Sequence, residues 1–216
     1  MGVQHSCEEF YEETIRQQRC SGLRSCCRDV RSVRRHRTPP LAIDSARVTI
    51  SGTSNIHEYT ASTKVVRVTR SQVGSAIAGA GFWTEELKPG AIEAFEVAIP
   101  AATLSSPKEG LDKNMHKALK VQEHPDITFR LSRFEVNESV AGKARALGTL
   151  RIAGVEREVA LDLTTKRSGA TLTVQGSLDL LMTDYGITPP KAMLGMLKTD
   201  PKVTVTFETV LSVPLT

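Results

Sequence analysis

The side chains that could do chemistry lie in patterns that do not form a familiar active site. Two acidic pairs stand out, Glu85 with Glu86 and Asp179 with Asp184. General acid–base catalysis needs two carboxylates held apart in a dry cleft, and neither pair implies one. The five histidines lack the H-x-H or H-x₃-H spacing that zinc sites favour. We therefore predict no catalytic residue and no metal site, and interpret the carboxylates as solvated surface charges and the histidines as structural or surface side chains.

The cysteines are confined to the start of the chain, at Cys7, Cys20, Cys26 and Cys27. Even with His5, they lack the paired C-x₂-C spacing of zinc-binding domains. The same region, residues 1–40, carries eight arginines against five acidic residues and ends in two prolines. It has too few apolar residues to bury a core. We predict that residues 1–40 are a disordered, arginine-rich segment or the product of a wrongly assigned start.

Residues 41–216 have the composition of one folded domain. The chain of 216 residues is 40% hydrophobic, and its net charge of +4 leaves only +1 for this part. A nearly neutral domain lacks the basic footprint of a nucleic-acid-binding protein. No run of 18 apolar residues is present, so we predict no transmembrane segment. We also recognise no secretory signal, because the basic residues near the N-terminus are not followed by an apolar run.

One helix is predicted in the middle of this domain, over residues 111–122. Leu111, Met115, Ala118 and Leu119 would share one face of it, and His124-Pro125 would end it because the residue before proline disfavours helical geometry. A second short helix is predicted over residues 188–198, which begin with paired prolines. Almost everything else alternates as strands do.

About eight strands are predicted, joined by short turns, so the fold class is all-β with an antiparallel meander. Residues 57–69 are predicted as a single strand, and residues 74–83 are too rich in small residues to assign. A phase change at Arg133-Phe134 suggests a β-bulge. Glycine-containing turns are expected at Ala153-Gly154 and Ser168-Gly169. A helix inserted into such a run of strands suggests a barrel with a lid or plug.

The most regular alternation lies in residues 148–163, 171–182 and 203–210. Their apolar faces would line one interior and comprise Leu150, Ile152, Val159, Leu161, Leu163, Leu172, Val174, Leu178, Val203, Val205 and Phe207. These side chains could simply fill a core, as in a β-sandwich. They could equally line a cavity, as in a barrel that holds a ligand. Periodicity alone leaves both readings open.

Residues 41–216 resemble the YceI-like family of lipid- or polyisoprenoid-binding domains. The resemblance rests on residues 52–62 (GTSNIHEYTAS), 111–129, 148–163 and 181–208, in matching order and spacing. It implies a lipocalin-like antiparallel barrel and an elongated apolar tunnel for an isoprenoid chain, such as a quinone tail. It also implies export to the bacterial periplasm or beyond. The missing signal, and a segment at residues 71–90 without the phenylalanine-rich strand of relatives, depart from the pattern.

We therefore expect noncatalytic binding or transport of an amphipathic lipid, a polyisoprenoid or an isoprenoid quinone, and no other cofactor. The expected tunnel wall consists of Phe129, Leu131, Leu150, Ile152, Leu161, Leu172, Val174 and Phe207, capped by Met193 and Met196. His57, Tyr59 and His116 are candidates for contact with a polar head. The alternatives are a filled barrel acting as a stress-related structural or interaction protein, and a small hydrolase without a recognised constellation. The sequence allows a homodimer and, if there is no export, a cytoplasmic location.

Overall fold

The computed structural model describes residues 41–73, 83, 92–107, 109–137, 140–192 and 197–212. The predictions for residues 1–40 lie outside this part of the chain. The described residues form one antiparallel sheet of ten strands. The strands are β1 (Ala42–Ser54), β2 (Glu58–Thr63), β3 (Arg67–Val73), β4 (Ile92–Pro100), β5 (Asp126–Val136), β6 (Lys143–Ile152), β7 (Val155–Ser168), β8 (Thr171–Leu181), β9 (Lys191–Ala192) and β10 (Leu197–Ser212).

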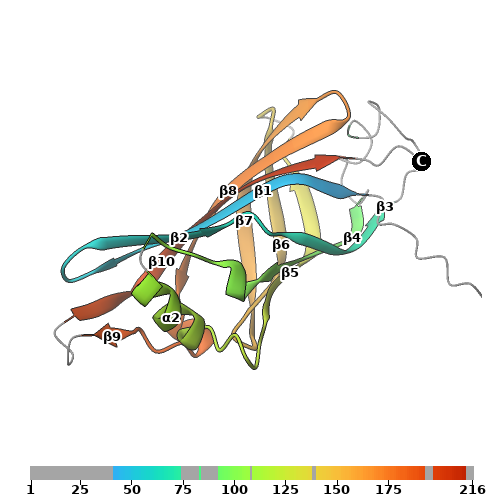
Figure 1. Cartoon of the computed structure of the whole chain (residues 1–216). Coiled ribbons are helices and arrows are strands. Elements are labelled where there is room, and N and C mark those ends of the chain that lie inside the picture. Colours follow the sequence, from blue (N-terminus) through green and yellow to red (C-terminus); the bar gives the residue numbers. More distant parts are fainter. Residues whose placement is uncertain are drawn as a thin grey trace, which may run out of the picture. The chain divides into compact units, whose positions relative to one another are not determined.

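The sheet is a meander that curls into a lipocalin-like barrel wall (Figure 1). The strand order is β2-β1-β10-β8-β7-β6-β5-β4-β3, so the C-terminal strand β10 pairs with the N-terminal strand β1. The two edge strands, β2 and β3, follow each other in the chain. The edge of β2 is partly covered, because Ser62 and Ser105 exchange two backbone hydrogen bonds of 2.8 and 3.1 Å. The predicted all-β antiparallel fold is confirmed.

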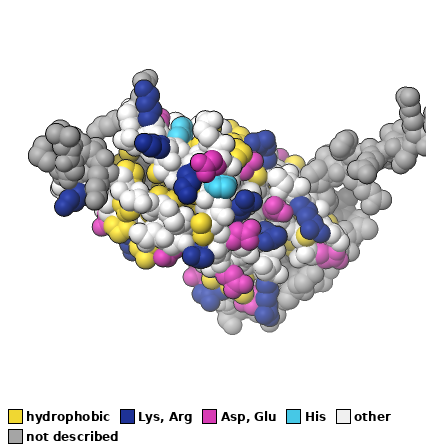
Figure 2. All heavy atoms as spheres, turned by 90° about the horizontal axis from the view of Figure 1, so that it is seen from below, with side chains coloured by type: hydrophobic (Ala, Val, Ile, Leu, Met, Phe, Trp, Pro, Cys, Tyr) yellow, Lys and Arg dark blue, Asp and Glu magenta, His cyan; other side chains and the backbone are white. Residues whose placement is uncertain are grey.

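Two local features of the wall follow the sequence closely. The β6–β7 hairpin turns at Ala153 and Gly154, whose φ angles of 49° and 83° are the positive pair of a type I′ turn. The register between β5 and β6 shifts between Leu131 and Arg133, where the phase change suggested a bulge. Outward positions are polar, and Figure 2 shows charges of both signs mixed with small apolar areas on one face.

The strand predicted over residues 57–69 is in fact two strands, β2 and β3. The break falls at residues 64–66. There the Thr63 hydroxyl accepts a hydrogen bond of 3.0 Å from the backbone N–H of Val65. A side chain that takes a backbone donor in this way competes with the strand ladder. The alternation of side chains in the sequence continues across residues 64–66, so it gave no sign of the break.

The predicted central helix is present as α2 (Glu109–Ala118), but it ends earlier than expected. Lys120 adopts a left-handed φ of 52°. The N–H of Val121 donates to the carbonyl of His116, and that of Lys120 donates to Lys117, both at 3.1 Å. This pair of bonds is a Schellman motif, which satisfies the last carbonyls and stops the helix before the proline is reached.

The second helix predicted over residues 188–198 is wrong where the structure describes that segment. Lys191 and Ala192 form β9, which pairs with Lys198 and Leu197 of β10.

Two short 3₁₀ turns also occur, η1 (Ala101–Thr103) and η2 (Met182–Tyr185). Of the elements whose bounds lie within the described ranges, α2 is the one α-helix. It lies at one end of the barrel wall (Figure 1). That part of the chain holds no helix of the length and apolarity needed to cross a membrane.

Candidate ligand-binding site

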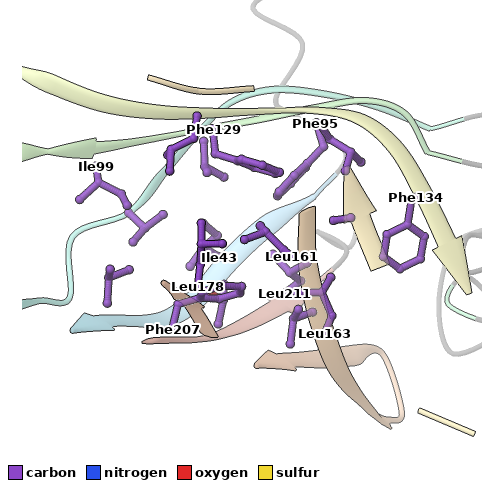
Figure 3. Close-up of a pocket in the computed structure, with 18 of the residues that line it drawn as sticks. Ile43, Phe95, Ile99, Phe129, Phe134, Leu161, Leu163, Leu178, Phe207 and Leu211 are labelled. Atoms are coloured by element: carbon purple, nitrogen blue, oxygen red, sulfur yellow. The ribbon is translucent and has the colours of Figure 1, made fainter. Parts of the chain in front are cut away.

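The curled sheet surrounds a cavity of about 200 Å³, called here the dry cavity. Among the described residues that line it, Thr209 alone is polar. Figure 3 shows its side chains converging from several strands, with Phe129 and Ile99 on one side of the space and Phe207 and Leu178 on the other. The wall of the dry cavity is supplied by the inward faces of β1, β4 to β8 and β10, because alternate residues of a strand point to one side. The interior is therefore a lined space and not a fully packed core.

Trp83, the only tryptophan in the chain, lines the dry cavity. Its side chain is buried, at 1% exposure, against Leu41, Leu172 and Leu211. The indole Nε1 donates a hydrogen bond of 2.8 Å to the carbonyl of Ala170, in the β7–β8 turn. The ring thus satisfies its polar atom while its apolar surface faces the cavity.

A second cavity of about 140 Å³, called here the capped cavity, lies under α2. Leu111, Asn114, Met115 and Ala118 line it from one face of the helix, at the spacing expected for neighbours on a helix surface. The predicted apolar face of this helix, including buried Leu119, is therefore the face turned to the barrel. Ile187 and residues of η2 complete the cap.

The two cavities are neighbours along the barrel. Leu180 of β8 and Val205 of β10 line both of them. Both side chains are partly buried and inward-facing.

The capped cavity is more polar than the dry one, and its polar groups are uncharged. Tyr59, Asn114, Tyr185 and Thr199 lie in its wall. Burial raises the pKa of Tyr59, and the charge of Asp200 raises it further. Burial is also the main cause that raises the pKa of Tyr185, against an opposing effect of Arg157. Both phenols therefore remain protonated at neutral pH and can donate a hydrogen bond.

No charged side chain lines either cavity within the described residues. Those residues also contain no cluster of three groups able to hold a metal ion. Asp179, one of the candidate carboxylates, faces outward and lies 2.8 Å from Nζ of Lys202. Hydrogen bonds from Lys202 and then Thr204 lower the pKa of Asp179, which marks it as an ion-paired surface group. Glu85 and Glu86 lie outside the described residues.

The sequence model of one protein family matches residues 42–211, described as the YceI-like domain. This match covers most of the chain. The protein belongs to the YceI-like family. No curated protein matches the chain.

Solved structures share the fold of this YceI-like domain at low sequence identity. BcnA of Burkholderia cenocepacia is 16% identical with a TM-score of 0.59, over 78% of this chain and 99% of that one. A polyisoprenoid-binding domain from Saccharophagus degradans, implicated in plant cell wall breakdown, is 16% identical with a TM-score of 0.58, over 82% and 100%. A YceI protein of Campylobacter jejuni is 14% identical with a TM-score of 0.50, over 70% and 85%.

The structure of this YceI-like domain places most of the predicted wall residues around the dry cavity. Those seven are Phe129, Leu131, Leu150, Leu161, Leu172, Val174 and Phe207. Ile152 lines the capped cavity instead, because it lies at the end of β6 that α2 covers. Met193 and Met196, the predicted cap, lie outside the described residues.

The three candidates for a polar head are not together. Tyr59 lines the capped cavity. His116 lines neither cavity, and its Nε2 lies 2.8 Å from the carbonyl of Leu104, which ties α2 to the segment after η1. His57 is exposed in the β1–β2 turn, where its carbonyl accepts a hydrogen bond of 2.7 Å from the Ser54 hydroxyl. The His116 ring and the His57 backbone thus have hydrogen-bond partners away from the cavities.

Sequence reasoning missed two kinds of site residue. Tyr185 is the last residue of η2 and Thr199 lies near the start of β10, and no local pattern indicated that both would line a cavity under α2. Gly148 and Gly176 also escaped notice, although each interrupts an otherwise apolar inward face. A glycine at such a position signals close approach of another group, and this signal was available in the sequence.

Proposed function

We propose that this YceI-like protein binds and carries an amphipathic lipid with an isoprenoid tail and an uncharged head, such as a polyisoprenoid alcohol or an isoprenoid quinone. One observation carries the proposal: a cavity inside the curled sheet whose lining, among the described residues, is apolar except for Thr209. The fold it shares with a solved domain described as polyisoprenoid-binding supports the same conclusion. An apolar chain gains about 0.8 kcal/mol for each methylene removed from water, so such a wall favours it without polar contacts.

The sizes of the cavities favour a ligand that occupies both. The dry cavity of about 200 Å³ is below the range of roughly 300–1,000 Å³ typical of ligand pockets. Adding the capped cavity of about 140 Å³ brings the space to the lower end of that range. A tail in the dry cavity would place the polar head beside Tyr59 and Tyr185, after Leu180 and Val205 move apart.

The uncharged lining favours a neutral head over a phosphate, diphosphate or carboxylate. Burying an ionised group without a partner costs several kcal/mol. Two protonated phenols can instead donate to a carbonyl or hydroxyl oxygen. Binding of this kind requires no catalytic group, and we propose that the protein is a carrier and not an enzyme. Its action in the periplasm or outside the cell is part of the proposal and rests on the family resemblance; mass spectrometry of the mature N-terminus would test it.

The test is native mass spectrometry of the protein purified from bacteria, followed by titration with ubiquinone carrying several isoprene units. We expect a retained lipid and quenching of Trp83, the single tryptophan, which lines the dry cavity. Leu161→Ala should alter the affinity, whereas Asp162→Ala, its outward neighbour on β7, should not. The filled-barrel alternative would be supported if the protein retained no lipid and its tryptophan fluorescence did not change when the quinone was added.

A further inference from the structure

Two glycines occupy inward-facing positions in the wall of the dry cavity. Gly176 of β8 lies between Val174 and Leu178, and both of these neighbours line the cavity. Gly148 of β6 is buried between Ala146 and Leu150, which also line it. Because strand residues alternate between the two faces, a side chain at either glycine would point into the bore.

An aromatic ring occupies the place of each missing side chain. A methyl group on Gly176 would lie 2.5 Å from Cζ of Phe207, the residue paired with it on β10. A methyl group on Gly148 would lie 2.6 Å from Cζ of Phe129, a diagonal neighbour on β5. Both distances are far shorter than a normal carbon–carbon contact of about 3.5–4.0 Å. Each ring therefore rests directly on a glycine, an arrangement known from other sheets.

These two glycine–phenylalanine pairs lie on the two sides of β7. Gly176 pairs with Leu163 of β7, and Gly148 pairs with Val159 of the same strand. Figure 3 shows Phe129 and Phe207 on different sides of the cavity. A side chain at either glycine would move the adjacent ring away from the backbone of the wall. Since the sheet blocks the outward direction, the ring would move into the bore.

We propose that Gly176 and Gly148 determine ligand specificity by keeping the bore wide enough for a methyl-branched chain. This inference rests on the proposed function and adds the residues that select a branched tail. With the rings held against the wall, the bore accepts the methyl branches of an isoprenoid. With a ring pushed inward, it accepts a straight alkyl chain better than a branched one.

Gly176→Ala is the informative substitution. The groups it would contact are the far end of Phe207 and Cδ2 of Leu163, at 3.0 Å, and both can move. At Gly148 the methyl group would also lie 2.5 Å from the backbone carbonyl of Arg130, so a variant there risks unfolding. The probes are geranylgeraniol and 1-hexadecanol, which have main chains of equal length with and without methyl branches. Their affinities are measured by displacement of a ubiquinone that quenches Trp83.

We expect Gly176→Ala to weaken geranylgeraniol binding by roughly tenfold or more, the usual effect of one methylene in a tight apolar pocket. The affinity for 1-hexadecanol should change less than about threefold. In a Phe207→Leu background the ring is absent, so Gly176→Ala should no longer discriminate between the two alcohols. Equal losses for both alcohols, or discrimination that persists without the ring, would overturn the inference.

Two controls keep this result separate from the proposed function. If Gly176→Ala does not fold, Phe207→Leu alone must shift preference toward the branched alcohol, and an unchanged preference counts against the inference. If the unmodified protein binds neither alcohol, that result contradicts the proposed function itself and not the role of the glycines. The position of the ring is then decided by a crystal structure of Gly176→Ala, in which a Phe207 ring still resting on β8 would refute the role assigned to the glycine.

Discussion

The dry cavity and the capped cavity belong to one barrel but differ in the elements that line them. The dry cavity is lined almost entirely by inward faces of long strands, and Thr209 is its only polar lining residue in the described chain. The capped cavity takes part of its lining from α2, η2 and the start of β10, which supply an amide, a phenol and a hydroxyl, and strand β2 adds the phenol of Tyr59. The long strands thus make an apolar wall, whereas the elements at the α2 end introduce polar groups.

The largest effect should come from placing a charge in each cavity. Leu161→Glu puts a carboxyl among apolar side chains and should lower the free energy of unfolding by about 3 kcal/mol or more. Met115→Glu, on the half-buried face of α2 near Asn114, should cost less than half as much because water and polar groups are closer. Urea denaturation at pH 7 measures both. Equal losses would mean that the two cavities do not differ in polarity as described.

The boundary between the cavities offers the next test. Val205→Phe enlarges a side chain that lines both spaces and should block passage between them. We expect quinones with long isoprenoid tails to lose roughly tenfold in affinity, while a quinone with a single isoprene unit loses little. Thr206→Phe, on the outward side of the same strand, is the matched control. A uniform loss across tail lengths would argue against one continuous bore.

A smaller effect is expected at the polar end. Tyr185→Phe removes one hydroxyl from the capped cavity and should weaken quinone binding by about 1 kcal/mol, roughly fivefold, the usual net contribution of a hydrogen bond. Squalene, which has an isoprenoid chain and no polar head, should bind both proteins equally. Fluorescence titration of Trp83 reports both ligands. The head is placed wrongly if the substitution affects squalene as much as the quinone.

The smallest effect concerns pH. The pKa values of Tyr59 and Tyr185 are both raised in the folded protein, mainly by burial, above the ordinary 10.0. A raised pKa favours the protonated form, so this contribution to stability is complete below about pH 10 and is lost as the pH rises through the folded-state values. The melting temperature should therefore fall above about pH 10, and less steeply in the double variant Tyr59→Phe/Tyr185→Phe. If the melting temperature depended on pH in the same way in both proteins, the two phenols would not be the cause of the decrease.

Local rules explain why so much of the wall could be predicted. Period-two alternation identified the inward residues of β7, including Leu161, because a strand has only two faces. Turn chemistry placed the hairpin at Ala153-Gly154. The same rules missed the break after Thr63 and the early end of α2, since these depend on one hydrogen bond and on a pair of hydrogen bonds that the pattern of apolar residues does not encode.

Alternation and turn residues were enough to predict an antiparallel barrel and to name the side chains that face its interior. They were silent on how far along the barrel axis each residue lies, which is why Ile152 was grouped with the dry wall although it meets α2. Whether the interior is hollow was also undecided. That depends on the curvature of the sheet and on which side chains meet across it, as Phe207 meets Gly176 from a strand about thirty positions away in the sequence. Such contacts arise only when distant strands such as β8 and β10 pair, because they join residues that no local pattern connects.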